Sequence, residues 1–289
     1  MSTYSGTAPF TFGSERYHTW YTVFGDLKHS RHRSLVALHG GPGMSHHYMR
    51  STKVIHERAG RPVVLYDQIG SGESSHCTHA PPDFWTIELF IAQLESLLQW
   101  LEIVDDFDLL GHSWGGMLAV EYAAKHRPPG LKHLILSNTM ASVPLLISGL
   151  EKLRDQFPNG YADMMRKQEE EGAFESSEYK LAIAQFCKKH LCTIKPPQDF
   201  LLSMADAQEN RHIYRIMWGA SEFRPTGILK DWTVVDFLHR IQCPSLLLSG
   251  RMDQAQEIAY SPFLTNLPNI KWINFENSSH LPQYEEPEK

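Results

Sequence analysis

The sequence predicts an α/β fold in which helices cover a mostly parallel sheet, with a helical cap inserted into it. Short aliphatic runs bounded by glycine, proline or polar residues alternate with segments of helical periodicity, a pattern typical of parallel strands joined by helices. Hydrophobic residues make up 42% of the 289 residues and charged residues 21%, so the chain can bury a substantial core and is not intrinsically disordered. The alternation stops over residues 142–237, which predicts the insertion.

The aliphatic runs predict buried parallel strands. They cover residues 35–38, 63–66, 107–110, 133–136, 245–248 and 270–275. The alternating aromatic stretch 17–24 predicts an antiparallel strand at the edge of the sheet. Residues 86–101 carry apolar side chains at helical spacing, and the alanine-rich residues 117–126 predict a helix packed tightly on the sheet.

The predicted cap is helical and charged. Residues 174–191 predict one of its helices, and residues 167–171 predict a solvated helical face. We therefore expect a core of residues 1–141 and 238–289, interrupted by a cap, or lid, of residues 142–237.

Charge and hydropathy exclude some classes of partner. The chain has 27 Lys and Arg against 33 Asp and Glu, a net charge of −6, whereas nucleic-acid binding needs a concentrated basic face. No run reaches the ~20 apolar residues of a membrane span, and residues 1–12 lack the basic start and apolar core of a signal peptide. With four irregularly spaced cysteines, we expect a cytoplasmic protein with reduced thiols and no nucleic-acid or membrane partner. The oligomeric state is left open.

A candidate nucleophile lies in Gly-His-Ser-Trp-Gly, residues 111–115, which fits the G-x-S-x-G elbow. The motif directly follows the predicted strand 107–110 and opens the predicted helix 117–126, the strand–turn–helix setting that it requires. The serine of such a turn is strained, and side chains at the flanking glycines would collide with the neighbouring strand and helix. We therefore expect Ser113 to be a nucleophile rather than an incidental serine in a glycine-rich turn.

A serine nucleophile needs a base that takes its proton and a carboxylate that orients the base, in the chain order Ser, Asp or Glu, His. Asp253 follows the predicted strand 245–248, and His280 follows the predicted strand 270–275. Loops at the carboxyl ends of parallel strands lie where such sheets bind ligands. We expect Asp253 and His280 to complete a triad, the alternatives being a helix N-cap for Asp253 and a surface position for His280.

The oxyanion of such chemistry needs two N–H donors. One is the backbone N–H after the nucleophile, here that of Trp114, and the other lies in the loop after an earlier strand. That loop is His-Gly-Gly-Pro-Gly, residues 39–43. Gly41 is the expected donor, because a residue without a side chain lets the backbone approach the intermediate.

Several motifs then occur together. They are residues 39–43, Tyr-Asp-Gln-Ile-Gly-Ser-Gly-Glu-Ser at 66–74, Gly-His-Ser-Trp-Gly-Gly at 111–116, and the late Asp253 and His280. In combination they resemble the proline iminopeptidase family, and the cap segment 218–232 is similar to the branch of tricorn-interacting aminopeptidases and L-amino-acid amidases. The resemblance implies an α/β-hydrolase fold and a serine aminopeptidase, with Asp67 in a structural turn outside the triad.

The resemblance also implies how substrate binds. Members of the family hold the substrate's free α-amine with acidic residues, one in the cap, which matches Glu222, and another directly after the triad aspartate. That second position is Gln254 here, which can accept a hydrogen bond from an ammonium but adds no opposing charge. We expect Glu222, Gln254, Gly40 and Trp218 to contact substrate.

The motifs therefore predict a serine hydrolase that acts through an acyl-enzyme. The resemblance implies that it cleaves a small aminoacyl amide or short peptide, with a preference for N-terminal proline. We expect no cofactor and no metal. Residues 76–79, His-Cys-Thr-His, lack a second ligand pair, while His46 and His47 either line the pocket or begin a helix. Gln254 leaves open an amidase or esterase of specialised metabolism whose substrate has no free amine, and the fold leaves open a non-catalytic ligand-binding protein.

Overall fold

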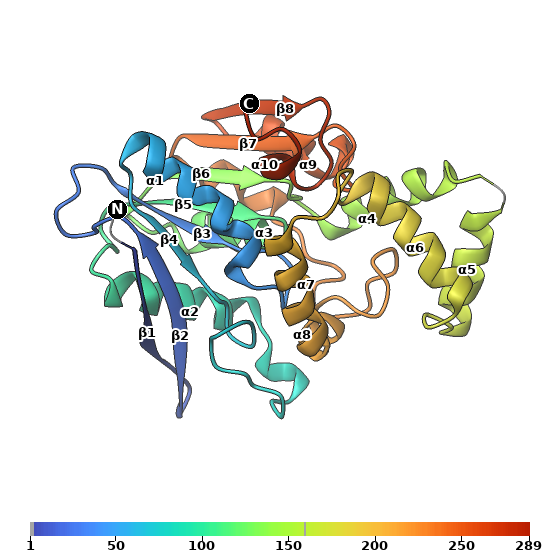
Figure 1. Ribbon diagram of the computed structural model, residues 1–289, viewed down its shortest axis with the longest axis horizontal. Helices are drawn as coiled ribbons and strands as arrows, with labels where there is room; N and C mark the ends of the chain where they lie inside the picture. Colours follow the sequence, from blue (N-terminus) through green and yellow to red (C-terminus); the bar gives the residue numbers. More distant parts are fainter. Residues whose placement is uncertain (1–2, 159) are drawn as a thin grey trace.

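The computed structural model describes residues 3–158 and 160–289 and is built on an eight-stranded sheet in the order β1-β2-β4-β3-β5-β6-β7-β8 (Figure 1). Residues 1, 2 and 159, which fall in the predicted core and cap, lie outside the described residues. The strands are β1 (Thr3–Phe12), β2 (Glu15–Phe24), β3 (Ser34–Leu38), β4 (Val63–Tyr66), β5 (Phe107–His112), β6 (Leu131–Ser137), β7 (Ser245–Gly250) and β8 (Ile270–Phe275).

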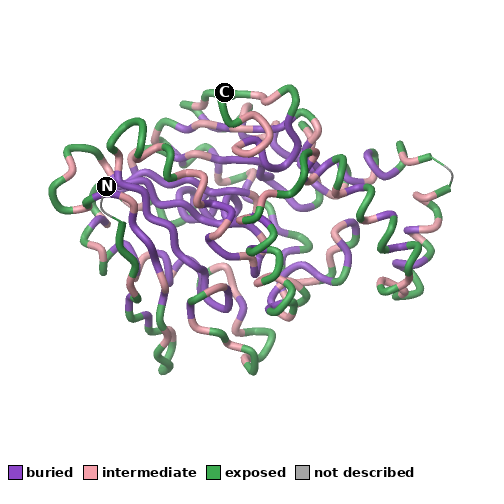
Figure 2. Tube along the Cα trace, viewed as in Figure 1, coloured by how far each residue is buried: buried purple, intermediate pink, exposed green. Residues whose placement is uncertain are grey.

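The aliphatic runs form β3 to β8, which pair in parallel as predicted. Every residue of β3, β4 and β5 is buried, which explains why these strands are continuous apolar runs without alternation. Figure 2 shows the buried positions concentrated along these central strands.

The strand predicted at residues 17–24 is antiparallel, as expected, but its edge position was wrong. β2 lies between β4 and β1, and β1 pairs with it along its whole length, from Thr3 opposite Phe24 to Phe12 opposite Glu15. β1 is mostly exposed and contains Pro9. Proline is tolerated in an edge strand, where one row of backbone groups is unpaired.

Helices cover the sheet as predicted. α2 (Ile87–Trp100) begins at Thr86, whose side chain accepts a hydrogen bond from the backbone N–H of Leu89 over 3.2 Å. The predicted helix 117–126 is α3 (Trp114–Glu121), which begins earlier than expected and runs into a π-helical turn, η3 (Tyr122–His126). The other helices around the sheet are η1 (His46–Thr52), α1 (Lys53–Ala59), η2 (Pro82–Phe84), η4 (Val235–Arg240), α9 (Glu257–Asn266) and α10 (Pro282–Glu285).

The segment between β6 and β7 is helical. It contains α4 (Val143–Asp155), α5 (Tyr161–Glu171), α6 (Ser177–His190), α7 (Gln198–Glu209) and α8 (Arg211–Met217), so the helix predicted at 174–191 is confirmed. In Figure 1, α4, α5 and α6 extend away from the sheet, whereas α7 and α8 lie closer to it. The division into a core of residues 1–141 and 238–289 and a cap, or lid, of residues 142–237 stays a prediction.

The solvated face predicted at residues 167–171 is wrong for two of its positions. Gln168 and Glu169 are buried, because α5 packs one side against α6 and α4. Glu169 accepts hydrogen bonds from Arg154 over 2.8 Å and from Ser221 over 2.8 Å. One residue of this charged run thus belongs to a buried ion pair whose partner, Arg154, lies on α4.

No helix in residues 3–158 and 160–289 combines the length and the apolar composition needed to cross a lipid bilayer.

The buried ion pair gives a stability prediction. Glu169→Ala leaves the Arg154 guanidinium, which is 3% exposed, with Glu151 as its remaining carboxylate. We expect the free energy of unfolding to fall by about 3 kcal/mol, measured by urea denaturation followed by circular dichroism. Glu170→Ala, at the exposed neighbouring position, is the control and should change it by less than about 0.5 kcal/mol. Equal losses in both variants would contradict the pairing.

Candidate active site

Ser113 occupies a strained turn between β5 and α3, with φ 56° and ψ −122°. The turn is possible because two flanking residues lack side chains. A Cβ at Gly115 would lie 2.3 Å from the carbonyl oxygen of Leu38, and a Cβ at Gly111 would lie 2.2 Å from the carbonyl oxygen of Gly115. Both distances are far below van der Waals contact. The steric reason predicted for the glycines of the elbow is confirmed.

Asp253 and His280 are brought together from the loops after β7 and β8. His280 Nδ1 lies 2.7 Å from Asp253 Oδ1, and both side chains are buried. Asp253 also accepts a hydrogen bond from Asn138 Nδ2 over 2.8 Å. The alternative of a helix N-cap is wrong, because α9 is preceded by Gln256, and the alternative of a surface histidine is wrong because His280 is 4% exposed.

The pair sets the charge of the imidazole. Burial disfavours a charged ring, but the Asp253 carboxylate outweighs it, with help from Glu222 and Glu285, and raises the pKa of His280. The hydrogen bond to Asp253 places the proton on Nδ1 in the neutral ring, which leaves Nε2 as the basic nitrogen.

The elbow and the histidine loop are in contact through the residue before Ser113. His112 Nε2 donates to the backbone carbonyl oxygen of His280 over 2.8 Å, and the centroids of the two rings lie 4.7 Å apart. Within the described residues, no hydrogen bond joins Ser113 Oγ to His280. Catalytic hydrogen bonds of this kind are often formed only with substrate bound.

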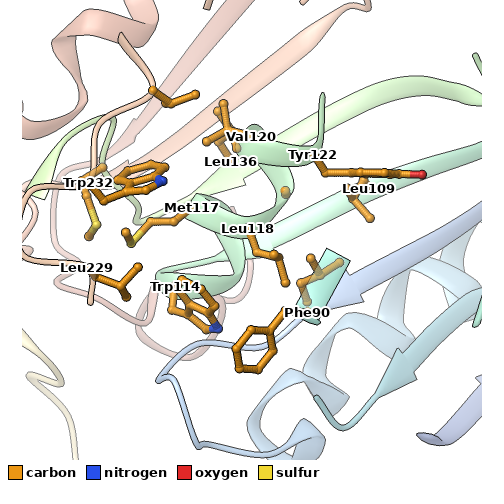
Figure 3. Close-up of a cluster of buried hydrophobic side chains, with 14 of the residues drawn as sticks. Phe90, Leu109, Trp114, Met117, Leu118, Val120, Tyr122, Leu136, Leu229 and Trp232 are labelled. Carbon is orange, nitrogen blue, oxygen red and sulfur yellow. The ribbon is translucent and has the colours of Figure 1, made fainter. Parts of the chain in front are cut away.

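A small cavity of about 20 Å³ opens at Ser113, room for one or two water molecules. Its lining comprises Gly41, Pro42, Ser113, Trp114, Met117, Met140, Tyr214, Trp218, Glu222, Leu229 and Gln254. It includes neither Asp253 nor His280. Figure 3 shows Trp114 and Met117 on the side of α3 that faces Leu229, so one wall of the cavity is apolar.

Three of the four expected substrate contacts, Glu222, Gln254 and Trp218, line the cavity. Gly40 does not. It packs behind the nucleophile, where its N–H donates to Tyr48 Oη over 2.6 Å and an added Cβ would lie 3.1 Å from Ser113 Cβ.

The expected oxyanion donors, Gly41 and Trp114, both line the cavity beside Ser113. Neither backbone N–H donates a hydrogen bond to any residue that the structure describes. Gly41 has φ +121°, and a Cβ there would lie 2.6 Å from the backbone nitrogen of Gly43. Only glycine fits this position without moving the loop.

Glu222 is the one carboxylate among the lining residues. It accepts a hydrogen bond from the Tyr214 hydroxyl, and Gln254 Nε2 lies 3.5 Å from its other oxygen. Burial raises the pKa of Glu222, against the opposing effects of Tyr214 and His280. The cavity therefore offers a partly desolvated carboxylate with neutral hydrogen-bond donors around it.

The segment that carries Glu222 is held from both sides. Ser221 Oγ donates to the buried Glu169 over 2.8 Å, and the Arg154 guanidinium stacks over the Phe223 ring at 4.9 Å. The ion pair between α4 and α5 thus fixes the residues on either side of the cavity carboxylate.

Sequence reasoning missed several residues that shape the site. Asn138, in the left-handed conformation with φ 49°, bonds Asp253 and also donates to the carbonyl oxygen of Ser279 over 3.0 Å. Glu285 of α10 accepts from the backbone N–H groups of Ser279 over 2.8 Å and Leu281 over 3.2 Å. Both brace the loop of His280, and neither belongs to a motif or a periodic pattern.

The other histidine and carboxylate residues considered in the sequence, Asp67, His46 and His76, form hydrogen bonds within the fold and do not line the cavity. Asp67 accepts hydrogen bonds from the N–H groups of His46 over 2.7 Å and Glu73 over 2.9 Å, which confirms its predicted role in a turn. His46 begins η1 and does not line the cavity. His76 contacts Asn210 and the carbonyl oxygen of Gly72. Over residues 3–158 and 160–289, no three His, Cys, Asp or Glu side chains are grouped to bind a metal ion.

The sequence of this chain is similar to those of known proteins over most of its length. The sequence profile of the α/β hydrolase fold matches residues 33–287. The chain is 34% identical over 273 residues to the proline iminopeptidase of Clostridium botulinum, covering 94% of this chain and 92% of that one. It is also 34% identical over 280 residues to the proline iminopeptidase of Saccharolobus solfataricus, covering 96% and 87%.

Two crystal structures are similar over nearly the whole chain. VinJ superposes with a TM-score of 0.92 at 40% identity, covering 98% of this chain and 94% of VinJ. The proline iminopeptidase of Mycobacterium smegmatis superposes with a TM-score of 0.90 at 35% identity, covering 99% and 94%.

The Asp253–His280 pair gives a titration prediction. We expect the pKa of His280 to lie above the ordinary histidine value of about 6.5 because the carboxylate favours the charged ring. In Asp253→Asn that charge is gone while burial persists, so the pKa should fall below the ordinary value. NMR titration of the imidazole resonances measures both, and His280→Gln identifies the signal among the 16 histidines. An unchanged pKa in Asp253→Asn would contradict the pairing.

Proposed function

Because the chain belongs to the α/β-hydrolase fold family and, within it, to the proline iminopeptidase family, we propose that it is a serine aminopeptidase. Its substrates are short peptides or small aminoacyl amides, from which it releases an N-terminal residue, foremost proline. The observation that carries the proposal is the cavity in which Ser113 and the free N–H groups of Gly41 and Trp114 share one space with the carboxylate of Glu222.

The chemistry proceeds in two displacements. Ser113 Oγ attacks the carbonyl carbon while His280 Nε2 takes the hydroxyl proton, and the same proton passes to the leaving amine as the C–N bond breaks. Water then attacks the acyl-enzyme with His280 again acting as base, which releases the amino acid and regenerates Ser113. Asp253 holds the imidazole with Nε2 as the basic nitrogen and stabilises the charged ring.

The negative charge of each tetrahedral intermediate develops on the former carbonyl oxygen. The N–H groups of Gly41 and Trp114 are the donors in the proposal, each contributing roughly 3–4 kcal/mol to transition-state stabilisation by analogy with other hydrolases. Their lack of other partners in the described part of the chain supports this role, because the donors need no rearrangement to bind an oxyanion.

Recognition of the free amine falls to Glu222, with Gln254 beside it. The substrate's ammonium would pair with the carboxylate and donate a hydrogen bond to the amide oxygen of Gln254, a neutral partner. One charge rather than two therefore faces the amine. Because Glu222 lines the same small cavity as Ser113, the proposal places the free amine close to the bond that is cleaved, which favours release of a single N-terminal residue.

Gln254 also favours a second candidate, an amidase or esterase whose substrate has no free amine. A neutral amide at this position and the apolar wall formed by Met117, Met140 and Leu229 would suit an uncharged acyl group. The two candidates share the nucleophile and differ in the need for an ammonium.

The proposal needs no cofactor or metal, and its partner is the substrate alone. We place the reaction in the cytoplasm. The four cysteines, Cys77, Cys187, Cys192 and Cys243, are all free, which agrees with a reducing compartment.

Removal of the nucleophile tests the mechanism. In Ser113→Ala, we expect turnover of proline arylamide to fall by about 10⁶-fold, to background, because no group remains to form the acyl-enzyme. A fluorophosphonate probe should label the unaltered protein on Ser113 and leave the variant unlabelled. Circular dichroism of the variant should match that of the unaltered protein. Turnover that survives in the folded variant would refute the mechanism.

Blocking the amine separates the two candidates. We expect N-acetylation of proline arylamide to lower kcat/KM by roughly 10- to 100-fold, because the charge-assisted hydrogen bonds to the ammonium are lost. In Glu222→Gln this penalty should shrink, because the variant gains little from the charge.

The matched control is Glu170→Gln, which changes an exposed carboxylate of α5 and should keep the full penalty. A simple aryl ester completes the series. If acetylation costs nothing in the unaltered protein, the aminopeptidase proposal is wrong and the amidase or esterase takes its place.

A further inference from the structure

We propose that Tyr48 and His112 are positioning residues, whose hydrogen bonds hold the oxyanion loop, the nucleophile and the catalytic histidine in register. The inference rests on the proposed function for its account of which groups react. It goes beyond that function because neither side chain touches the substrate cavity.

Tyr48 lies in η1 and is completely buried. Its hydroxyl oxygen accepts the backbone N–H of Gly40 over 2.6 Å, and the same oxygen lies 2.9 Å from His112 Nδ1. Gly40 directly precedes Gly41, and His112 directly precedes Ser113. One hydroxyl group therefore joins the oxyanion loop to the nucleophile elbow.

The direction of each hydrogen bond follows from the partners. The carbonyl oxygen of His280, 2.8 Å from His112 Nε2, can only accept, so Nε2 carries the proton. Burial, with the nearby His280, lowers the pKa of His112 to about 3, so the ring is neutral and Nδ1 is an acceptor. The Tyr48 hydroxyl must then donate to Nδ1 while it accepts from Gly40.

The resulting chain of bonds runs from Gly40 through Tyr48 and His112 to the backbone of His280. Each end lies within one residue of a group that the mechanism uses. All of the donors and acceptors are satisfied, and no bond in the chain can reverse without leaving a carbonyl or an N–H unpaired. A movement of any one loop therefore costs hydrogen bonds at the others.

The chain of bonds is also anchored to the segment between β6 and β7. The backbone N–H of Tyr48 donates to Ser203 Oγ over 3.1 Å, and Ser203 Oγ donates to the carbonyl oxygen of Ser45 over 3.1 Å. Ser203 belongs to α7 and is completely buried. This contact fixes η1, and with it the tyrosine hydroxyl, relative to α7.

The test measures the rate at which a fluorophosphonate probe labels Ser113, which depends on the nucleophile, the base and the oxyanion donors but not on recognition of an amine. Tyr48→Phe removes the hydroxyl and keeps the ring. We expect its labelling rate, and kcat for proline arylamide, to fall by roughly 10- to 100-fold, with KM changed by less than about twofold, because misplaced reacting groups lower the rate of the chemical step.

Tyr66→Phe is the matched control. Tyr66 is a completely buried tyrosine of β4 whose hydroxyl has no hydrogen-bond partner among the described residues. The control should label at the rate of the unaltered protein. Thermal unfolding of both variants separates loss of positioning from loss of folding.

A second pair of variants keeps the test decisive if Tyr48→Phe is unstable. His112→Gln retains an amide that can donate to the His280 carbonyl and accept from Tyr48, whereas His112→Leu loses both bonds. We expect the glutamine variant to label faster than the leucine variant by about 10-fold or more. The double variant Tyr48→Phe/His112→Leu should be no slower than His112→Leu, because the two residues act as one unit.

The outcomes are distinct. Labelling of Tyr48→Phe at the rate of Tyr66→Phe, or equal rates for the two His112 variants, would overturn the inference. Labelling of the unaltered protein without turnover of any aminoacyl arylamide would overturn the proposed substrate and leave the inference standing. Failure of the unaltered protein to label would overturn both.

Discussion

The close approach of α3 to the strands beneath it governs the geometry of the whole site. The backbone of Gly115 lies so near Leu38 that a Cβ would come within 2.3 Å of its carbonyl oxygen. The chain turns from strand to helix at Ser113, with φ 56°. Such a conformation costs about 1–3 kcal/mol. The buried packing of Trp114 and the rest of α3 against the sheet supplies the restraint that keeps it. The hydroxyl is therefore held at a point fixed by the core.

A parallel sheet extends that constraint to the other reacting groups. The strands β3, β5, β7 and β8 end at the same edge, and the loops that follow them carry Gly41, Ser113, Asp253 and His280. Hydrogen bonds between these loops restrain the residues. Asn138 bonds the Asp253 carboxylate and the backbone of Ser279, and His112 of the elbow bonds the backbone of His280. The strands bring the groups near one another, and hydrogen bonds between loops set the final positions.

The sequence was informative where the physical cause is local. Buried parallel strands must be apolar throughout, and an elbow must have glycines where side chains would collide, so both leave patterns in neighbouring letters. β1 left none, since an edge strand with few buried side chains has little reason to be apolar. Glu169 looked like its exposed neighbours because its partner lies in another helix. Asn138 meets Asp253 across 115 positions of sequence, and no spacing encodes such a contact. Tyr48 was hidden for the same reason.

The carboxylate of Glu222 connects substrate binding to the catalytic base, His280. Arg154 is paired with Glu169 and Glu151, and no Lys, Arg or His in the described ranges forms an ion pair with Glu222. The basic group coupled to the Glu222 carboxylate is the imidazole of His280, whose pKa the carboxylate helps to raise. In the proposed function, a substrate ammonium at Glu222 offsets that contribution, which lowers the pKa of His280 while the larger effect of Asp253 stays. Recognition of the amine and the basicity of His280 are therefore coupled through the carboxylate of Glu222.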